Sequence, residues 1–291
     1  MLKEATGRLI LAYFQLTKPI ISASVALSAL TGFLIFQGFF ARGWLLTMAG
    51  VFLLSSGSAA INHLQEAKTD VLMERTNRRP IPSGMIKPFQ ALFFAIILIF
   101  LGASILLQLD TRLPFFLGLI NMVWYNAIYT PLKRLTAFAA IPGAVVGAIP
   151  PIIGWTAAGG SITHHHAILL AFLFFIGQIP HFWLILLKNA GDYEKAGFPT
   201  LTQLFSPQQV ANLTLVWIFA TAMAAVMLVL FGIIRSAALS LVIFLITFFL
   251  LVSFRRWFNA KKYPDPHPAF ISLNIFYLLV MIVMIADALT R

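Results

Sequence analysis

Long runs of apolar residues alternate with short polar segments along the whole chain. Nine runs approach the length of about 20 residues that a helix needs to cross the roughly 30 Å hydrocarbon core of a bilayer. They cover residues 18–38, 44–63, 88–109, 113–131, 137–157, 166–187, 209–232, 236–254 and 268–288. The runs are continuous, unlike the short alternating strands of a membrane β-barrel. The pattern predicts an all-α membrane protein with about nine transmembrane helices, forming a single domain over residues 1–291.

Basic residues are divided unevenly between the two sets of connecting segments. With the N-terminus in the cytoplasm, sixteen of the 20 Lys and Arg residues fall in cytoplasmic segments. The four on the outside are Arg42, Arg112, Arg235 and Arg291. An excess of Lys and Arg in cytoplasmic loops is the usual topology signal of helical membrane proteins. The N-terminal residues show neither a cleavable signal pattern nor a mitochondrial transit pattern, so we expect a multi-pass protein of a bacterial plasma membrane.

Composition supports this class and excludes several chemistries. Of the 291 residues, 60% are hydrophobic and 10% are charged, against about 25% charged in a typical soluble protein. The net charge of +11 resides in short loops between apolar runs, which favours anionic lipid headgroups over nucleic acid as the partner. Since cysteine is absent, disulfides, thiolate-bound zinc, iron–sulfur clusters and a Cys nucleophile are excluded.

The few acidic residues cluster after the second apolar run. Asn62, Glu66 and Asp70 recur every four residues, so they share one face of an α-helix. Carboxylates at that spacing repel each other, and a bound cation would cancel the repulsion. Carboxylate and amide oxygens suit Mg²⁺. The alternative is a solvated helix end in which Lys68 and Arg75 pair with the acids.

A basic loop follows at once, with Arg75, Arg78 and Arg79. Guanidinium groups beside a Mg²⁺ site suit a diphosphate, because arginine binds phosphate oxygens in bidentate fashion. The Pro- and Gly-containing stretch 80–84 is expected to end the helix and make a turn. Taken alone, such an arginine cluster more often only holds its loop on the cytoplasmic side of the membrane.

A second acidic cluster, with Asp192 and Glu194, follows the sixth run. In the predicted topology it emerges on the same side as Asp70 and as Lys133 at the end of the fourth run. Tyr129 and Lys133 are four residues apart and could reach one phosphate; the alternative is an aromatic belt with a snorkelling lysine. The two acidic motifs are expected to hold Mg²⁺ on both sides of one diphosphate.

Two groups of histidines are interpreted differently. His181 lies in an apolar stretch with Gln178, where an ionisable residue is either functional or bonded to a neighbouring helix. His164, His165 and His166 lie in an outer segment and are expected to form an exposed polar loop.

Together these segments resemble the UbiA superfamily of intramembrane prenyltransferases. Its first motif is similar to Asn62-x-x-x-Glu66-x-x-x-Asp70 followed by Arg75-Thr76-x-x-Arg79-Pro80. Further segments resemble the heme branch of that superfamily, the protoheme IX farnesyltransferases. They are Leu16-Thr17-Lys18-Pro19, Gly147-Ala-Ile-Pro150-Pro151-Ile-Ile-Gly154-Trp155, His181-Phe182-Trp183 and Asp192-Tyr193-x-x-Ala196-Gly197-x-Pro199. The resemblance extends over nearly the whole chain.

The resemblance implies helices bundled around a central cavity that opens laterally to lipid. It implies transfer of a farnesyl group from farnesyl diphosphate to the 2-vinyl group of heme b, giving heme O for a downstream heme A synthase or terminal oxidase. The residues implied for Mg²⁺ are Asn62, Glu66, Asp70 and Asp192. Those implied for the diphosphate are Lys18, Arg75, Arg79, Tyr129 and Lys133. His181 is the first choice for a porphyrin contact.

The chain departs from the family pattern at two positions: Glu66 stands where Asp is commoner, and Thr200 stands where Met is usual. Ala196 replaces the second carboxylate of quinone-pathway members, which fits the heme branch. One alternative remains a UbiA-type enzyme that prenylates an aromatic quinone precursor. The other is a transporter, which would place charges near the bilayer centre and show matching repeats; here the carboxylates crowd at one face.

Overall fold

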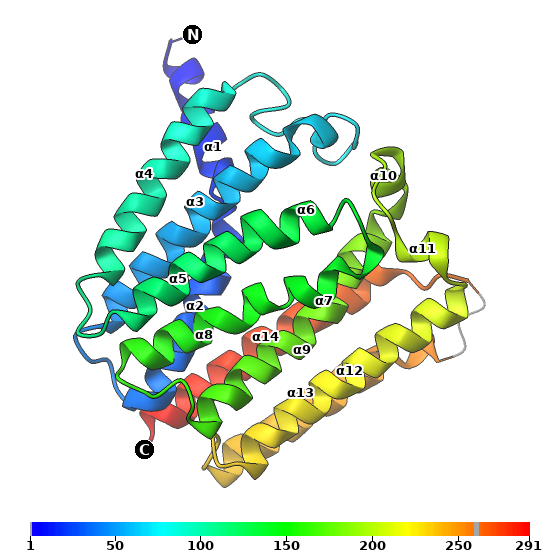
Figure 1. The fold of residues 1–291 in the computed structure, drawn as a ribbon. Coiled ribbons are helices and arrows are strands. Elements are labelled where there is room, and N and C mark those ends of the chain that lie inside the picture. Colours follow the sequence, from blue (N-terminus) through cyan, green and yellow to red (C-terminus); the bar gives the residue numbers. More distant parts are fainter. Residues whose placement is uncertain (1, 259–261) are drawn as a thin grey trace.

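The structure is helical throughout the part of the chain that it describes (Figure 1). This computed structural model describes residues 2–258 and 262–291; Lys261, one of the basic residues counted above, lies outside these ranges. Eight helical segments in the described chain are long and apolar enough to cross a membrane, as expected for a multi-pass membrane protein. They are α2 (Pro19–Gln37), α3 (Trp44–Asp70), α4 (Pro88–Leu106), the segment Ala137–Ala157, α9 (His165–Lys188), α12 (Pro207–Leu230), the segment Ala237–Trp257 and α14 (Pro266–Leu289).

Two of these segments are composite, and shorter helices connect or precede the spans. Ala137–Ala157 contains η2 (Ala137–Ala139), α7 (Ala140–Gly143) and α8 (Val145–Ala157). Ala237–Trp257 contains α13 (Ala237–Ser253) and η3 (Arg255–Trp257). The short helices are α1 (Leu2–Leu16), α10 (Ala190–Lys195) and α11 (Leu201–Leu204).

The fourth predicted span, residues 113–131, is interrupted. It consists of α5 (Leu113–Val123), the π-helical segment η1 (Trp124–Tyr129) and α6 (Thr130–Leu132). The backbone N–H of Thr130 donates to the carbonyl of Tyr125, five residues earlier. Pro131 lacks an N–H, and its ring clashes with the carbonyl four residues back in an α-helix, so a widened turn fits here. The widened turn lies next to Tyr129 and Lys133.

Helix α3 corrects the predicted boundary. The expected span ended at residue 63 and the helix end was placed at 80–84, but α3 continues unbroken to Asp70, and turns follow. At 1.5 Å per residue, 27 residues rise about 40 Å, beyond a hydrocarbon core of about 30 Å. The last turns, with Glu66 and Asp70, therefore lie at one end of the bundle.

A break separates α9 from α10. Helix α9 ends at Lys188, one residue beyond the predicted sixth span, 166–187; Asn189 departs from helical geometry with φ −120° and ψ 24°, and α10 begins at Ala190. His181 and Asp192 therefore lie on two different helices.

The long helices pack side by side, with α5 on α8, α8 on α9 and α9 on α12, while α2 contacts α3, α8 and α14 (Figure 1). The Pro150-Pro151-x-x-Gly154 motif of α8 packs directly against α2. A Cβ on Gly154 would lie 1.7 Å from the carbonyl oxygen of Ala29, and one on Gly32 would lie 1.9 Å from that of Pro151. Only glycine fits at these two crossing points.

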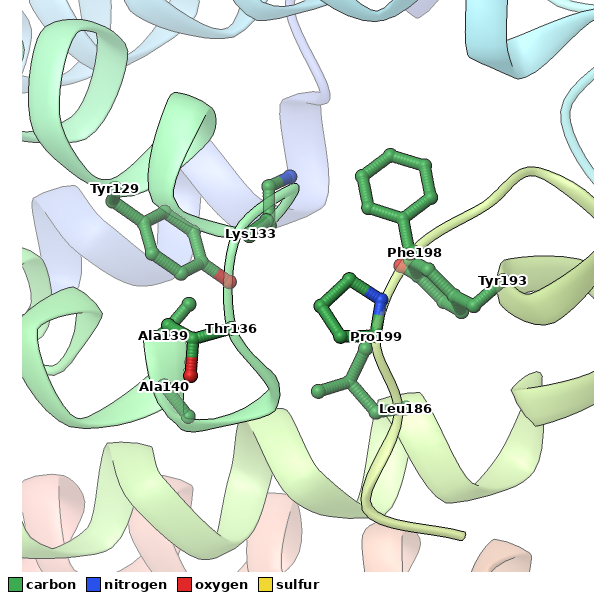
Figure 2. Close-up of a pocket in the computed structure, with 9 residues that line it drawn as sticks. All are labelled: Tyr129, Lys133, Thr136, Ala139, Ala140, Leu186, Tyr193, Phe198 and Pro199. Carbon is green, nitrogen blue, oxygen red and sulfur yellow. The ribbon is translucent and has the colours of Figure 1, made fainter. Parts of the chain in front are cut away.

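The ends of α3 and α6, the turns 71–87 and α10 meet at one end of the bundle, which we call the polar end. A small pocket opens there between the η1–α7 segment and the α9–α10 segment (Figure 2).

Candidate active site

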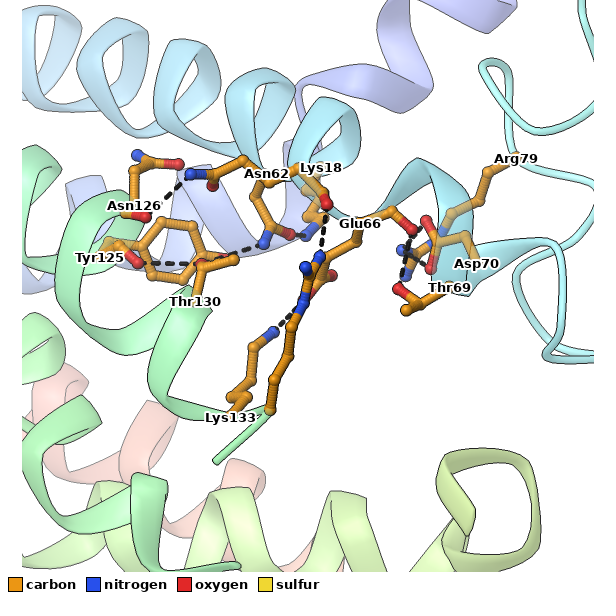
Figure 3. A network of polar contacts seen from close by, with 12 residues as sticks. Lys18, Asn62, Glu66, Thr69, Asp70, Arg79, Tyr125, Asn126, Thr130 and Lys133 are labelled. Atoms are coloured by element: carbon orange, nitrogen blue, oxygen red, sulfur yellow. Dashed lines mark hydrogen bonds and ion pairs between the residues drawn. The ribbon is translucent and has the colours of Figure 1, made fainter. Parts of the chain in front are cut away.

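Three side chains of α3 form the core of the site. Asn62, Glu66 and Asp70 are 1%, 8% and 0% exposed, and each contacts a cation from another segment (Figure 3). Lys18 Nζ donates to Asn62 Oδ1 at 2.7 Å, Lys133 forms an ion pair with Glu66, and Arg79 donates to both oxygens of Asp70 at 2.9 and 2.8 Å. The structure therefore pairs each expected metal ligand of α3 with an expected diphosphate-binding residue.

The backbone of Lys18 is strained. Its φ of 45° and ψ of 60° make it the one non-glycine residue with positive φ in the described chain, a conformation that costs about 1–2 kcal/mol for an L-residue. Pro19 starts α2 directly after it and disfavours α geometry at the preceding residue. The strained backbone places the Lys18 ammonium beside Asn62, and such outliers cluster at functional sites.

The interrupted fourth span supplies further residues. Asn62 Nδ2 donates to Thr130 Oγ1 at 3.2 Å, and Thr130 in turn donates to the Tyr125 carbonyl at 2.9 Å. Asn126 donates to Ser58 Oγ at 2.5 Å. Thr130 and Asn126 were not among the predicted site residues, because a hydroxyl and an amide in an apolar run carry no distinctive spacing.

The His181-Phe182 segment of α9 adjoins this core through Tyr129. The rings of Phe182 and Tyr129 stack with centroids 5.1 Å apart, and Lys133 Nζ lies 5.2 Å from the Tyr129 ring centroid. The ring of His181 lies 5.0 Å from that of Phe270 in α14. Aromatic contacts therefore connect the α9 motif to the residue that pairs with Glu66.

Helix α10 meets the turns after α3. Asp192 Oδ2 accepts a hydrogen bond from the backbone N–H of Arg75 at 3.2 Å, and Lys195 pairs with Glu74 at 2.9 Å. Arg75 itself is exposed. The hydrogen bond to Glu74 raises the pKa of Lys195. Both acidic motifs thus lie at the polar end, as their spacing along the predicted topology indicated.

Thr200, one of the departures from the family pattern, has a structural role. Its Oγ1 donates to Glu194 Oε1 at 2.8 Å, and its backbone N–H donates to Gln203 Oε1 at 3.2 Å at the start of α11. Thr202 also donates to Glu194, at 2.7 Å. Glu194 therefore binds the segment that follows α10 through Thr200 and Thr202.

The pocket at the polar end is lined largely by aromatic and apolar groups (Figure 2). It touches Tyr129 and Lys133 on one side and Tyr193 and Phe198 on the other. The pocket therefore lies beside Lys133, which contacts Glu66.

His63 is a buried residue that sequence reasoning missed. It is 3% exposed, and neither ring nitrogen has a hydrogen-bond partner. In the sequence, only its position directly after Asn62 indicated that it could belong to the site. At the other end of α9, the prediction of an exposed histidine loop was partly wrong. His164 caps α9, and His165 and His166 are its first residues; two of the three are exposed, and one ring nitrogen of each lies within 4.8 Å of the others.

The sequence of this chain is similar to those of a known protein family. The model of the UbiA prenyltransferase family matches residues 19–280. The protoheme IX farnesyltransferase of Geobacter sulfurreducens is 41% identical over 185 residues, covering 64% of this chain and 68% of that protein. The protoheme IX farnesyltransferase of Oleidesulfovibrio alaskensis is 30% identical over 276 residues, covering 92% and 93%.

Solved structures share the fold at low sequence identity. A structure of a UbiA homolog from Archaeoglobus fulgidus bound to GPP and Mg²⁺ superimposes with a TM-score of 0.70 at 16% identity, covering 96% of this chain and all of that one. A structure from work on digeranylgeranylglyceryl phosphate synthase in membranes gives a TM-score of 0.78 at 15% identity, covering 98% and 100%. The match of the family model to residues 19–280 shows that the protein belongs to the UbiA prenyltransferase family.

Proposed function

We propose that this protein transfers the farnesyl group of farnesyl diphosphate to the 2-vinyl group of heme b and thereby makes heme O. The single observation that carries the proposal is the buried constellation on α3, where three oxygen ligands each contact a cation. The names of the similar proteins support the choice of acceptor.

The residues of the site fit a hard divalent cation. Asn62, Glu66 and Asp70 present oxygen atoms from one face of α3, and Asp192 comes from the facing α10. Buried carboxylates without a metal need countercharges, and here Lys133 and Arg79 supply them. These four side chains would hold Mg²⁺, which would supply positive charge to the departing diphosphate.

The cations have a second role once the carboxylates hold a metal. Lys18, Arg79 and Lys133 are then free to bind phosphate oxygens, together with Arg75 and the hydroxyl of Tyr129. These groups stabilise the negative charge that develops as the C1–O bond of farnesyl diphosphate breaks. No covalent bond to the protein is required, because the leaving diphosphate takes the electron pair and leaves an allylic cation.

The aromatic pocket is the proposed place for the acceptor. The terminal vinyl carbon of heme b attacks C1 of the farnesyl cation, and water captures the resulting cation and loses a proton, which gives a hydroxyethylfarnesyl group. Phe182, Tyr129 and Tyr193 exclude bulk water from the allylic cation. His181, next to Phe182 and Phe270, is the proposed porphyrin contact.

The direct test uses purified protein with Mg²⁺, farnesyl diphosphate and heme b. The expected product is a heme heavier by one farnesyl group plus one water, detected by mass spectrometry. His181→Ala should impair heme use more than binding of farnesyl diphosphate. Prenylation of 4-hydroxybenzoate or a naphthoate, with heme b unchanged, would replace this proposal with a quinone-pathway function while leaving the family membership intact.

We also propose that the polar end faces the cytoplasm of a bacterial cell, with the N-terminus on the same side. The distribution of Lys and Arg supports this orientation. Reporters fused after Asn77, Arg134 or Asp192 should report cytoplasm, and one fused after Gly159 should report the outside. An outside signal at Asp192 together with a cytoplasmic signal at Asn77 would contradict the shared site.

A further inference from the structure

His63 stands out because its imidazole is buried without a hydrogen-bond partner. A neutral imidazole has one donor and one acceptor nitrogen, and both are unsatisfied here. An apolar side chain would avoid this cost at the same position. A buried polar group without a partner in the unliganded protein indicates that its partner arrives in another state of the site.

The position of His63 on α3 narrows the choice of partner. It lies seven residues before Asp70, so the two residues stack on nearly the same line of the helix. It also lies three residues before Glu66, one helical turn away on the same side of α3. The imidazole therefore lies on the face of α3 that carries the polar cluster, although it makes none of that cluster's hydrogen bonds.

Lys18 is one of the three cations that lose their partner on α3 when the site is loaded. In the structure its ammonium donates to Asn62 Oδ1 at 2.7 Å, the same oxygen that the proposed function assigns to Mg²⁺. An ammonium group has three donors, so Lys18 can use an acceptor on the protein in addition to the phosphate oxygens. The lone pair of the His63 ring is an unused buried acceptor on the residue next to Asn62.

We propose that His63 is a positioning residue that accepts a hydrogen bond from Lys18 and holds its ammonium against the diphosphate. The inference rests on the proposed diphosphate site and adds a residue to it. The strained backbone of Lys18 fixes the base of that side chain, and His63 fixes its tip in the loaded state.

The test measures binding and stability separately. The probe is farnesyl thiolodiphosphate, a slowly reacting analogue, with Mg²⁺ and without heme. His63→Leu and His63→Phe both remove the ring nitrogens, so the test can use whichever of the two variants folds. We expect binding to weaken about tenfold or more, the range of one hydrogen bond to a charged group, while the unliganded melting temperature stays equal or rises. His63→Gln, which keeps an acceptor, should bind within about threefold of the unaltered protein.

A matched control comes from the same helix. Ser56 lies seven residues before His63 and is also buried with an unpartnered hydroxyl. Ser56→Ala should leave binding of the analogue unchanged. Lys18→Met should weaken binding less in the His63→Leu background than in the unaltered protein, because the two residues act as one unit.

Two results would overturn the inference. One is tight binding of the analogue by both His63→Leu and His63→Phe. The other is full additivity of the His63 and Lys18 substitutions. If the unaltered protein itself does not bind the analogue with Mg²⁺, the proposed function fails along with the inference; if the unaltered protein binds and the variants bind equally well, the inference alone fails.

Discussion

The two halves of the candidate site are built differently. On α3, the side chains of Asn62, Glu66 and Asp70 are buried and fixed by cations from distant segments. On α10, no residue is buried, and Asp192 and Lys195 contact the facing turns from partly or fully exposed positions. Buried pairs are costly to break, whereas exposed pairs contribute little. The α3 half is therefore preformed, whereas the α10 half is held in place by weaker, more exposed contacts.

The largest difference is expected from removing one charge in each half. Asp70→Asn and Asp192→Asn should each lower turnover more than about a hundredfold, or roughly 2.7 kcal/mol. Only Asp70→Asn should also destabilise the unliganded protein, by about 3 kcal/mol, because it leaves the charge of Arg79 unneutralised. Steady-state rates and melting curves measure both.

Asp110→Asn, an exposed acid in the turn between α4 and α5, is the matched control and should change neither quantity. If Asp192→Asn destabilised the unliganded protein as much as Asp70→Asn, the two halves would not differ in the way described.

A pair of arginine variants sharpens the account of the α3 half. Arg79 donates two hydrogen bonds to Asp70, whereas its neighbour Arg78 is exposed. Lysine keeps the charge but not the planar guanidinium group that places one nitrogen, Nη1, against both carboxylate oxygens of Asp70. Arg79→Lys should lower turnover about tenfold, equivalent to about 1.4 kcal/mol, and Arg78→Lys should stay within about twofold. Equal effects of the two variants would mean that the loop acts only through its net charge.

Much of this arrangement follows from sequence patterns, and some of it does not. Apolar runs predicted the spans, because a bilayer demands a fixed length of apolar helix. The four-residue spacing of Asn62, Glu66 and Asp70 predicted their common face. The pairing of Glu66 with Lys133 was out of reach, because long-range contacts depend on packing. The π-helical turn at Tyr129 and the break at Asn189 were missed, because hydropathy does not report local backbone geometry.

The segment after α10 offers a smaller test. Thr200 is buried and donates to Glu194, while Thr202 donates to the same oxygen. Thr200→Val should cost about 1 kcal/mol of stability, the usual contribution of one hydrogen bond, and should reduce turnover modestly by loosening the chain that carries Asp192. Thermal unfolding and rate measurements test this. Thr202→Val is the comparison and should have the weaker effect, because Thr202 is only partly buried. If the two substitutions cost the same stability, the burial of Thr200 would be unimportant.

The smallest effect is expected at the exposed pair between Glu74 and Lys195, which are 80% and 60% exposed. Glu74→Gln should leave the melting temperature unchanged, because exposed ion pairs are screened by solvent. It should also lower the pKa of Lys195, since the hydrogen bond to Glu74 raises that pKa. NMR titration of labelled lysine side chains measures the shift. A large loss of stability in this variant would show that α10 is fixed rather than loosely held.

The most direct measurement of the central claim is mass spectrometry of hemes from cells with and without this chain. The account predicts that a heme heavier by one farnesyl group plus one water appears only when the chain is expressed, and that it is lost with Asp70→Asn and with Asp192→Asn. An unchanged heme profile, together with the appearance of a prenylated aromatic acid, would contradict it.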